Sequence, residues 1–257
     1  MGDVSGPVVR CDVANGVATV TLDSPGNRNA LSRALLTGLH DALDRCERPD
    51  VRVVVLTHAG PAFCAGADLK ERSTGPTDST PMVRAMQRLI GSRCPTIAAV
   101  QGPVRAGGIG LMASCDIVVV QEDVTFAFTE VRIGVAPAII SVPILQRCGW
   151  SRLAAPFLTG ESFDAATARD MGLVTHVTHH VPHTVGTLVD GVLAGVLSIV
   201  ARQSAASMGK PFEEEADAAM RQQVEEQIER ESLPMFMSGK LYDDGIIDPR
   251  DTRTVLG

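Results

Sequence analysis

Short apolar runs alternate with amphipathic stretches in the first half of the chain, and this alternation constrains the fold most strongly. Strands are predicted at residues 17–22, 51–57, 96–100, 116–121 and 125–128. Helical spacing of apolar residues falls between some of these strands, at residues 32–47 and 82–90. Because strands that alternate with helices pack as layers around one sheet, the pattern predicts an α/β core.

Beyond Gly134 the pattern becomes helical. Helices are expected at residues 140–148, 152–158, 165–171, 185–204 and 212–231. A length of 257 residues suits one main domain with a small appendage. We therefore place a core domain at residues 1–195 and a C-terminal helical region at residues 196–257.

Composition excludes several classes of function. A net charge of −7 and an aromatic content of 4% argue against nucleic-acid binding. The N-terminus has no signal-peptide pattern, and the most apolar stretch, residues 185–200, is too short and interrupted to span a membrane. The six cysteines lack zinc spacing, which favours buried reduced thiols, no metal site and a cytoplasmic protein.

The stretch GIGLMASCD, residues 108–116, imitates a dinucleotide-binding fingerprint. A strand precedes it at residues 96–100, but only about six residues separate Gly108 from the next strand. That distance is too short for the crossover helix that such a site needs. The sequence therefore argues against a nicotinamide or flavin site here.

The glycines of this stretch still need a reason. Gly107 and Gly108 lie where a loop enters a short helix, and free backbone N–H groups there can hold an oxyanion. Tight helix packing explains one such motif equally well. A second loop, residues 63–69, also follows a buried strand and places small residues beside Gly66. Two such loops could direct two N–H donors at one thioester oxygen.

Five ordered motifs resemble the enoyl-CoA hydratase/isomerase (crotonase) family. They are NRNALS at 27–32, AFCAGADLK at 62–70, AAVQGPVRAGGIGL with CDI at 98–117, FAFTEVRIGVAP at 126–137 and LTGESFDAATARDMGLV at 158–174. The resemblance spans most of the chain. It implies a crotonase-type spiral of ββα units followed by a C-terminal helical region that serves oligomerisation, as a homotrimer or a dimer of trimers.

The resemblance also implies roles for single residues. Ala67 and Gly107 match the two oxyanion-hole donors, Glu130 matches an acid/base glutamate, and Gly108 would let the substrate approach. The positions that match the coenzyme A contacts are Arg28, Ala30, Ala65, Asp68 and Leu69. Lys70 fits a phosphate contact or a solvated surface equally well. The ligand would be an acyl-CoA thioester, and no separate cofactor is implied.

The sequence departs from the family pattern at Gly110, where hydratases of the family carry a second glutamate. Losing one acid or base slows a reaction by about 10²- to 10⁴-fold. Isomerisation needs only one base, so a single glutamate at Glu130 favours an isomerase on chemical grounds. The form of the motif at 126–137 instead favours a hydratase, which we prefer, and an isomerase or a non-catalytic acyl-CoA-binding homologue stays open. The motif at 126–137 resembles hydratases of branched or carboxylated acyl-CoAs such as 3-methylglutaconyl-CoA. Arg105, and less strongly Arg132, could pair with a substrate carboxylate.

Other features receive simpler interpretations. Asp116 is expected to anchor the start of a strand, Glu161 to begin a helix, and Trp150 to pack in the interior. The histidines of HVTHHVPH, residues 176–183, favour a surface loop over a metal site because no carboxylate or cysteine stands beside them. The tail LYDDGIIDPRDTRTVLG, residues 241–257, resembles the C-terminus of carboxyltransferase subunits of biotin-dependent acyl-CoA carboxylases.

Overall fold

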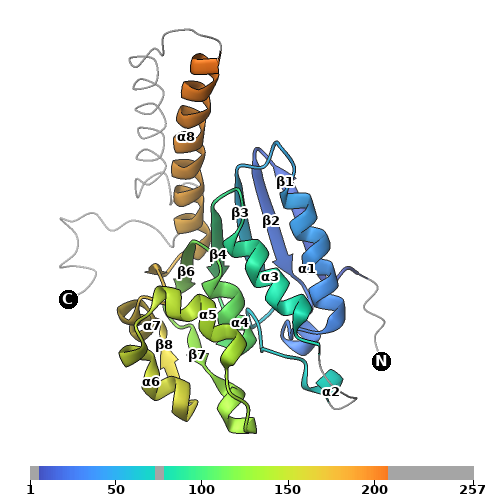
Figure 1. Cartoon of the computed structure of the whole chain (residues 1–257), viewed down its shortest axis with the longest axis vertical. Coiled ribbons are helices and arrows are strands. Elements are labelled where there is room, and N and C mark those ends of the chain that lie inside the picture. Colours follow the sequence, from blue (N-terminus) through green and yellow to red (C-terminus); the bar gives the residue numbers. More distant parts are fainter. Residues whose placement is uncertain (1–5, 73–77, 208–257) are drawn as a thin grey trace, which may run out of the picture. The chain divides into compact units, whose positions relative to one another are not determined.

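The computed structural model describes residues 6–72 and 78–207 of the chain (Figure 1). A first compact unit ends at Val185 and a second begins at Gly186. The helix expected at 212–231 and the tail at 241–257 lie outside the described residues. The division at residue 195 and the oligomerisation region therefore stay predictions.

The larger sheet has six strands, and five of them run parallel. Their spatial order is β1 (Val9–Ala14), β2 (Val17–Leu22), β3 (Val53–His58), β4 (Thr96–Val100), β6 (Ile117–Gln121) and β9 (His176–Thr178). Only β1 pairs antiparallel, with β2. Because neighbouring strands run parallel, the loops that follow β3 and β4 leave the same edge of the sheet.

A smaller, three-stranded sheet begins with the strand that follows β4 in the sequence. It joins β5 (Val104–Arg105), β7 (Thr125–Ala127) and β8 (Ser162–Asp164), with β5 parallel to β7 and β8 antiparallel to it. The α-helices are α1 (Arg33–Cys46), α2 (Leu69–Arg72), α3 (Thr80–Ile90), α4 (Gly107–Ala113), α5 (Ala138–Arg147), α6 (Trp150–Thr159), α7 (Ala165–Met171) and α8 (Val181–Ser207). Two short 3₁₀ helices are η1 (Pro25–Asn27) and η2 (Thr129–Ile133).

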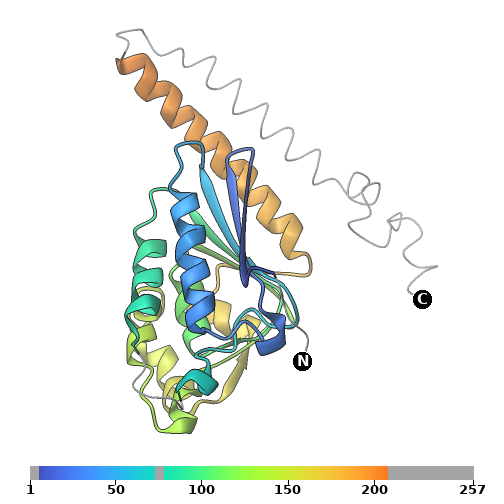
Figure 2. The ribbon, with the colours of Figure 1, turned by 90° about the vertical axis from the view of Figure 1, so that its right-hand side faces the viewer.

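Helices α1 and α3 lie together on one side of the strands (Figures 1 and 2). Helix α1 begins as the sequence predicts, because the Ser32 side chain caps it by accepting a hydrogen bond from the Leu35 N–H at 3.2 Å. Its apolar face, with Leu35, Leu39 and Leu43, is buried in the core. Strand β4 is buried along its whole length, as its continuous apolar run predicts.

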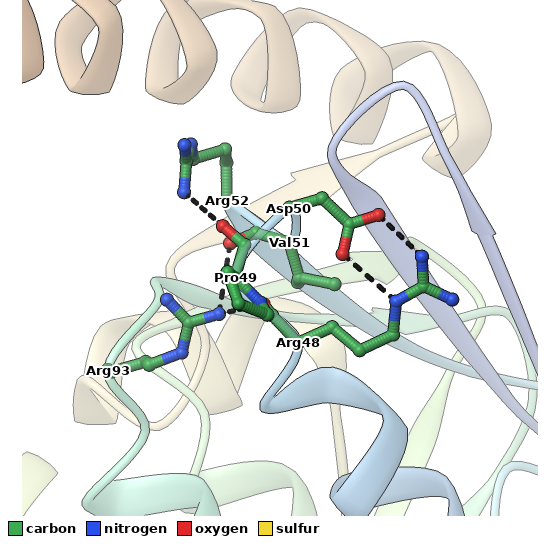
Figure 3. Close-up of polar contacts among 6 residues, drawn as sticks. All are labelled: Arg48, Pro49, Asp50, Val51, Arg52 and Arg93. Atoms are coloured by element: carbon green, nitrogen blue, oxygen red, sulfur yellow. Dashed lines mark hydrogen bonds and ion pairs between the residues drawn. The ribbon is translucent and has the colours of Figure 1, made fainter.

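The turn between α1 and β3 is held by arginines (Figure 3). Arg48 binds Asp50 through two hydrogen bonds of 2.9 and 2.7 Å. Arg93, which precedes β4, donates to the backbone carbonyls of Arg48 and Val51. The exposed Arg48–Asp50 pair adds little stability, but the carbonyl contacts tie together the starts of β3 and β4.

Asp116 anchors its strand, as predicted. Its Oδ2 atom accepts hydrogen bonds from the backbone N–H and the hydroxyl of Thr96, at 2.8 and 2.9 Å. The Thr96 hydroxyl oxygen accepts in return from the Asp116 N–H at 2.9 Å. This reciprocal pair aligns the starts of β4 and β6.

Several sequence-based expectations are wrong in the second half of the chain. Strands β8 and β9 interrupt the region expected to be helical, because three-residue strands are too short to show a period. Glu161 begins no helix: it precedes β8, and Asp164 caps α7 instead, accepting from the Thr167 N–H at 2.8 Å. Trp150 is 51% exposed and contacts Phe157 at its edge.

Asn29 is a fully buried polar side chain that joins two loops. It adopts a left-handed conformation with φ of 54°, which asparagine tolerates better than most residues. Its Nδ2 group donates to the carbonyls of Ala59 and Ala62 at 3.0 and 2.8 Å. Its Oδ1 atom accepts from the Ser24 N–H at 2.7 Å. Asn29 therefore fixes the loop after β3 against the loop that enters α1.

Replacing Asn29 with alanine should destabilise the fold by roughly 2–4 kcal/mol, because three backbone groups in two loops lose their partner. The free energy of unfolding, measured in urea, checks this. Gln87→Ala, at an exposed position of α3, should change it by less than about 0.5 kcal/mol. Equal stability of the two variants would contradict the role given to Asn29.

Candidate active site

A cavity of about 620 Å³ lies where the loops after β3 and β4 meet η2 and α5. Ala67 comes from the first loop, Gly107 begins α4, and Glu130 belongs to η2. All three residues line this one cavity. The structure thus brings together the three residues to which the sequence resemblance assigns catalytic roles, although their roles stay predictions.

The loop after β3 turns sharply at Gly66, which has a φ of +87°. Its carbonyl accepts a hydrogen bond from the Leu31 N–H at 2.8 Å, and Ala65 donates to the Arg28 carbonyl at 3.0 Å. These bonds pair the loop with the segment that enters α1. Among the described residues, the Ala67 N–H donates to no protein acceptor.

The second loop enters α4 through a strained residue. Ala106 has φ 48° and ψ −123°, a conformation that disfavours any residue with a side chain. The adjacent Gly107 N–H, like that of Ala67, has no protein acceptor within the described part of the chain. Its position at the first turn of a helix explains this, since such groups have no partner inside the helix.

The two loops are in direct contact. A β-carbon added at Gly66 would lie 2.8 Å from the Ala106 β-carbon and 3.6 Å from the Gly107 nitrogen. A β-carbon at Gly107 would lie 2.8 Å from Met82 Cε and 2.9 Å from Leu31 Cδ1, two residues that line the cavity. Glycine is therefore required at Gly66, whereas at Gly107 a side chain would have to displace the flexible ends of Met82 and Leu31. Two N–H donors are brought to one cavity wall, the arrangement that an oxyanion hole needs.

Glu130 is half-buried on η2, and its Oε2 atom is inaccessible to solvent. The helix ends at Gly134 in a left-handed conformation, φ 69°, whose N–H donates to the Val131 carbonyl at 3.2 Å. The Val135 N–H bonds to the Glu130 backbone carbonyl at 3.1 Å. The carboxylate is thus carried on a short, closed turn in the cavity wall.

The space expected for a second carboxylate is filled by hydrocarbon. Gly110 is buried in α4, and a β-carbon there would lie 2.6 Å from Ile140 Cγ2 and 2.8 Å from Ile140 Cβ. The Met86 sulfur would be 3.1 Å away. Ile140 is 2% exposed, and the close contacts involve its branched Cβ and Cγ2 atoms rather than the flexible end of the side chain. Gly110 therefore allows α5 to pack on α4 and contributes no surface to the cavity.

Gly108 has a packing role in this structure, and the role in substrate approach expected from the sequence stays a prediction. A β-carbon there would lie 2.7 Å from the Cys64 β-carbon and 3.0 Å from the Cys64 carbonyl oxygen. The Cys64 thiol is fully buried, and burial raises its pKa to about 12. It is therefore a neutral packing group and not a nucleophile.

The positions matched to coenzyme A contacts follow the same loops. Ala65 lines the cavity. Arg28 is exposed, and Ala30 is buried beside it. The Asp68 carboxylate accepts from the Lys70 N–H at 2.9 Å and lies 3.4 Å from Asn27 Nδ2. Leu69 begins α2, which also carries Lys70. Their contacts with coenzyme A stay predictions.

The sequence favours Arg105 over Arg132 as the partner of a substrate carboxylate, but the positions of the two side chains favour Arg132. Arg132 lines the cavity, whereas Arg105 does not. Arg105 points along β7, where it donates to the Thr125 carbonyl at 2.5 Å and to the Thr125 hydroxyl at 2.8 Å. Burial lowers the pKa of Arg105, and the nearby charge of Arg132 lowers it further.

Other lining residues were not identified from the sequence. Leu31, Leu36, Met82, Ile133, Ile139 and Ile140 form an apolar wall, and Asp78 adds an exposed carboxylate. Leu36, Met82 and Ile140 fall in helices that the sequence predicts, but their apolar spacing could not distinguish a cavity wall from core.

Within residues 6–72 and 78–207, no group of three His, Cys, Asp or Glu residues could hold a metal ion. His176 lies in β9, and His179 pairs with Glu122 at 2.7 Å. No helix in the described part of the chain is long and apolar enough to cross a membrane.

Comparisons with known proteins find relatives of one family. The model of the enoyl-CoA hydratase/isomerase family matches residues 12–238. A solved enoyl-CoA hydratase from Mycobacterium avium is 38% identical, with a TM-score of 0.67, covering 92% of this chain and 95% of its own. The mevalonyl-coenzyme A hydratase of Aspergillus fumigatus is 37% identical over 172 residues, which are 64% of this chain and 63% of the relative.

A different relative matches a shorter stretch. It is a probable biotin-dependent acyl-coenzyme A carboxylase beta2 subunit from Mycobacterium tuberculosis, 69% identical over 65 residues, covering 25% of this chain and 12% of its own length. The chain spans between 54% and 69% of the lengths of the curated hydratases that it matches.

Gly110→Ala should lower the free energy of unfolding by about 1–3 kcal/mol, because the new methyl group overlaps Ile140. Alanine is otherwise about 1 kcal/mol better than glycine within a helix, so the loss can arise only from this overlap. Gly26→Ala, where the added β-carbon meets nothing within 4 Å, is the matched control. Urea unfolding of both variants tests the packing, and a Gly110→Ala protein as stable as the parent would contradict it.

Proposed function

The chain belongs to the enoyl-CoA hydratase/isomerase family, and from this premise we propose that it adds water to the double bond of a 2-enoyl-CoA thioester. The proposal depends on one observation above all: Ala67, Gly107 and Glu130 line the same cavity. Relatives and solved neighbours named as enoyl-CoA hydratases support the same reaction.

In the proposed reaction the thioester oxygen accepts hydrogen bonds from the Ala67 and Gly107 N–H groups. Water adds to the β-carbon, and the electron pair of the double bond moves toward the thioester, so that negative charge grows on this oxygen. Preorganised N–H donors stabilise such a charge, and losing one donor typically costs about 10²- to 10³-fold in rate.

Glu130 handles the proton in this scheme. Its carboxylate removes a proton from the attacking water and then delivers a proton to the α-carbon, so that the elements of one water molecule are added. With hydrocarbon around Gly110, one carboxylate performs both steps. We expect slower turnover than in a hydratase with two glutamates, by about 10²- to 10⁴-fold.

A second candidate function is isomerisation of the double bond. The packing of Ile140 at Gly110 favours it, because isomerisation needs only one base, which removes a proton at one carbon and returns it at another. A non-catalytic acyl-CoA-binding homologue is the third alternative. The three differ in the absorbance of the conjugated thioester, which hydration removes and isomerisation of a 3-enoyl-CoA creates.

The acyl group is proposed to be branched or carboxylated, with 3-methylglutaconyl-CoA as the example. The motif at residues 126–137 supports this choice, and so does Arg132 in the cavity wall. One relative is named a mevalonyl-coenzyme A hydratase, and the mevalonyl group in that name is a branched acyl group. We also propose a cytoplasmic location, because all six cysteines are free and buried.

Glu130→Gln should reduce hydration of crotonyl-CoA or 3-methylglutaconyl-CoA by about 10²- to 10⁴-fold, because the amide cannot accept the proton. The loss of conjugated-thioester absorbance with time measures the rate. Glu161→Gln, at an exposed position outside the cavity, should keep the parental rate. Full activity of Glu130→Gln would refute the assignment of the acid/base.

Incubating the parent protein with a 3-enoyl-CoA separates the alternatives. A gain of conjugated absorbance would favour isomerisation over hydration. Tight binding of CoA esters without any absorbance change, for every substrate, would favour the non-catalytic homologue.

We propose a homotrimer or a dimer of trimers, with residues 196–257 as the oligomerisation region. Sedimentation velocity should therefore give a mass three or six times the 27.1 kDa of one chain. A single species at the mass of one chain would contradict this.

A further inference from the structure

Two arginines lie close together beside the candidate active site. Arg132 is carried by η2, two residues after Glu130, and lines the cavity. Arg105 is carried by β5, and its pKa is lowered both by burial and by the charge of Arg132. The positive charge of Arg105 repels that of Arg132, and an anion bound to Arg132 at the cavity wall would offset this repulsion.

Arg132 is held in a defined position. Its Nη2 group donates to the Gly160 carbonyl at 2.6 Å. The stem of the side chain packs at Gly160, where an added β-carbon would lie 3.3 Å from Arg132 Cγ. One contact orients the guanidinium and leaves several of its five N–H donors for a ligand.

The ion pairs of the described residues leave the charge of these two arginines unbalanced. Within the described residues, no carboxylate lies within ion-pair distance of Arg105 or Arg132. Arg105 is engaged with the carbonyl and hydroxyl of Thr125, which carry no net charge. Asp78 also lines the cavity, and among the described residues it forms no ion pair with Arg132.

We propose that Arg132, supported by the positive charge of Arg105, determines specificity by binding a carboxylate at the far end of the acyl group. The inference rests on the proposed function, since it assumes an acyl-CoA ligand in this cavity. It assigns the binding of the carboxylate to Arg132 in place of Arg105, the residue favoured by the sequence. A guanidinium suits this role because it can donate two parallel hydrogen bonds to one carboxylate.

The test compares two substrates of equal carbon number. Glutaconyl-CoA ends in a carboxylate where 2-pentenoyl-CoA ends in a methyl group, and the coenzyme A moiety is identical. Arg132→Gln should lower kcat/KM for glutaconyl-CoA by about 10- to 100-fold more than for 2-pentenoyl-CoA, as the loss of a charge-assisted hydrogen bond predicts. An arginine that bound a coenzyme A phosphate instead would lower both values equally, which would overturn the proposal.

Two further variants control the measurement. Arg132→Lys keeps the charge but loses the planar fork, and it should retain part of the preference for glutaconyl-CoA. Arg45→Gln removes an exposed arginine of α1 outside the cavity and should leave the ratio of the two values unchanged. Thermal unfolding of each variant reports whether the fold is intact.

Binding of saturated esters keeps the inference testable if no hydration is observed. Glutaryl-CoA should bind the parent protein more tightly than pentanoyl-CoA in calorimetry, and Arg132→Gln should abolish the difference. If the difference is present without turnover, the proposed function fails while the anion site stands. If the two esters bind the parent equally, or if the difference survives in Arg132→Gln, the anion site fails.

Discussion

The contact between the two loops at Gly66 and Ala106 is the constraint on which the candidate site depends. Gly66 adopts a φ of +87° and leaves no space for a β-carbon against Ala106. Ala106 itself adopts a strained backbone conformation immediately before Gly107. Such strain persists only where the surroundings over-determine it, and here hydrogen bonds from both loops to neighbouring strands do so. The result is a cavity wall with two N–H groups whose positions are set before any ligand enters.

The packing at Gly110 has a different consequence, because it limits the chemistry rather than enabling it. Ile140 of α5 occupies the space in which a second carboxylate would have to lie. The same contact holds α5 against α4, and α5 contributes Ile139 and Ile140 to the cavity. The cavity wall formed by α5 is thus apolar, where a hydratase with a second glutamate would present a carboxylate. The acid–base chemistry proposed for the cavity then depends on Glu130 alone, which η2 carries into the cavity wall.

Much of this arrangement could be predicted from the sequence, and the failures have physical causes. The strands at residues 17–22 and 96–100 and helix α7 were predicted with their observed bounds, because their apolar periods are clear. The motifs brought Ala67, Gly107 and Glu130 into one hypothesis, and the fold class and family were confirmed. Strands β8 and β9 were missed because tertiary pairing, not local pattern, creates them. The role of Asn29 was missed because its partners are backbone carbonyls about 30 residues away, which leave no sequence signal.

The side chains of Arg105 and Arg132 point in directions that their positions in the sequence motifs do not reveal. The motifs alone therefore could not decide which of the two faces the cavity. Arg105 lies two residues before Gly107 in the sequence, but β5 pairs with β7, and its guanidinium bonds to Thr125. Arg132 belongs to η2, which also carries Glu130, and the Gly160 carbonyl fixes its guanidinium from a segment 28 residues away. One short helix therefore carries both the proposed base and the proposed anion contact. Because both side chains extend from the same turn, a substrate carboxylate held by Arg132 would also fix the reacting double bond relative to Glu130. Binding specificity and proton transfer would then depend on a single structural element.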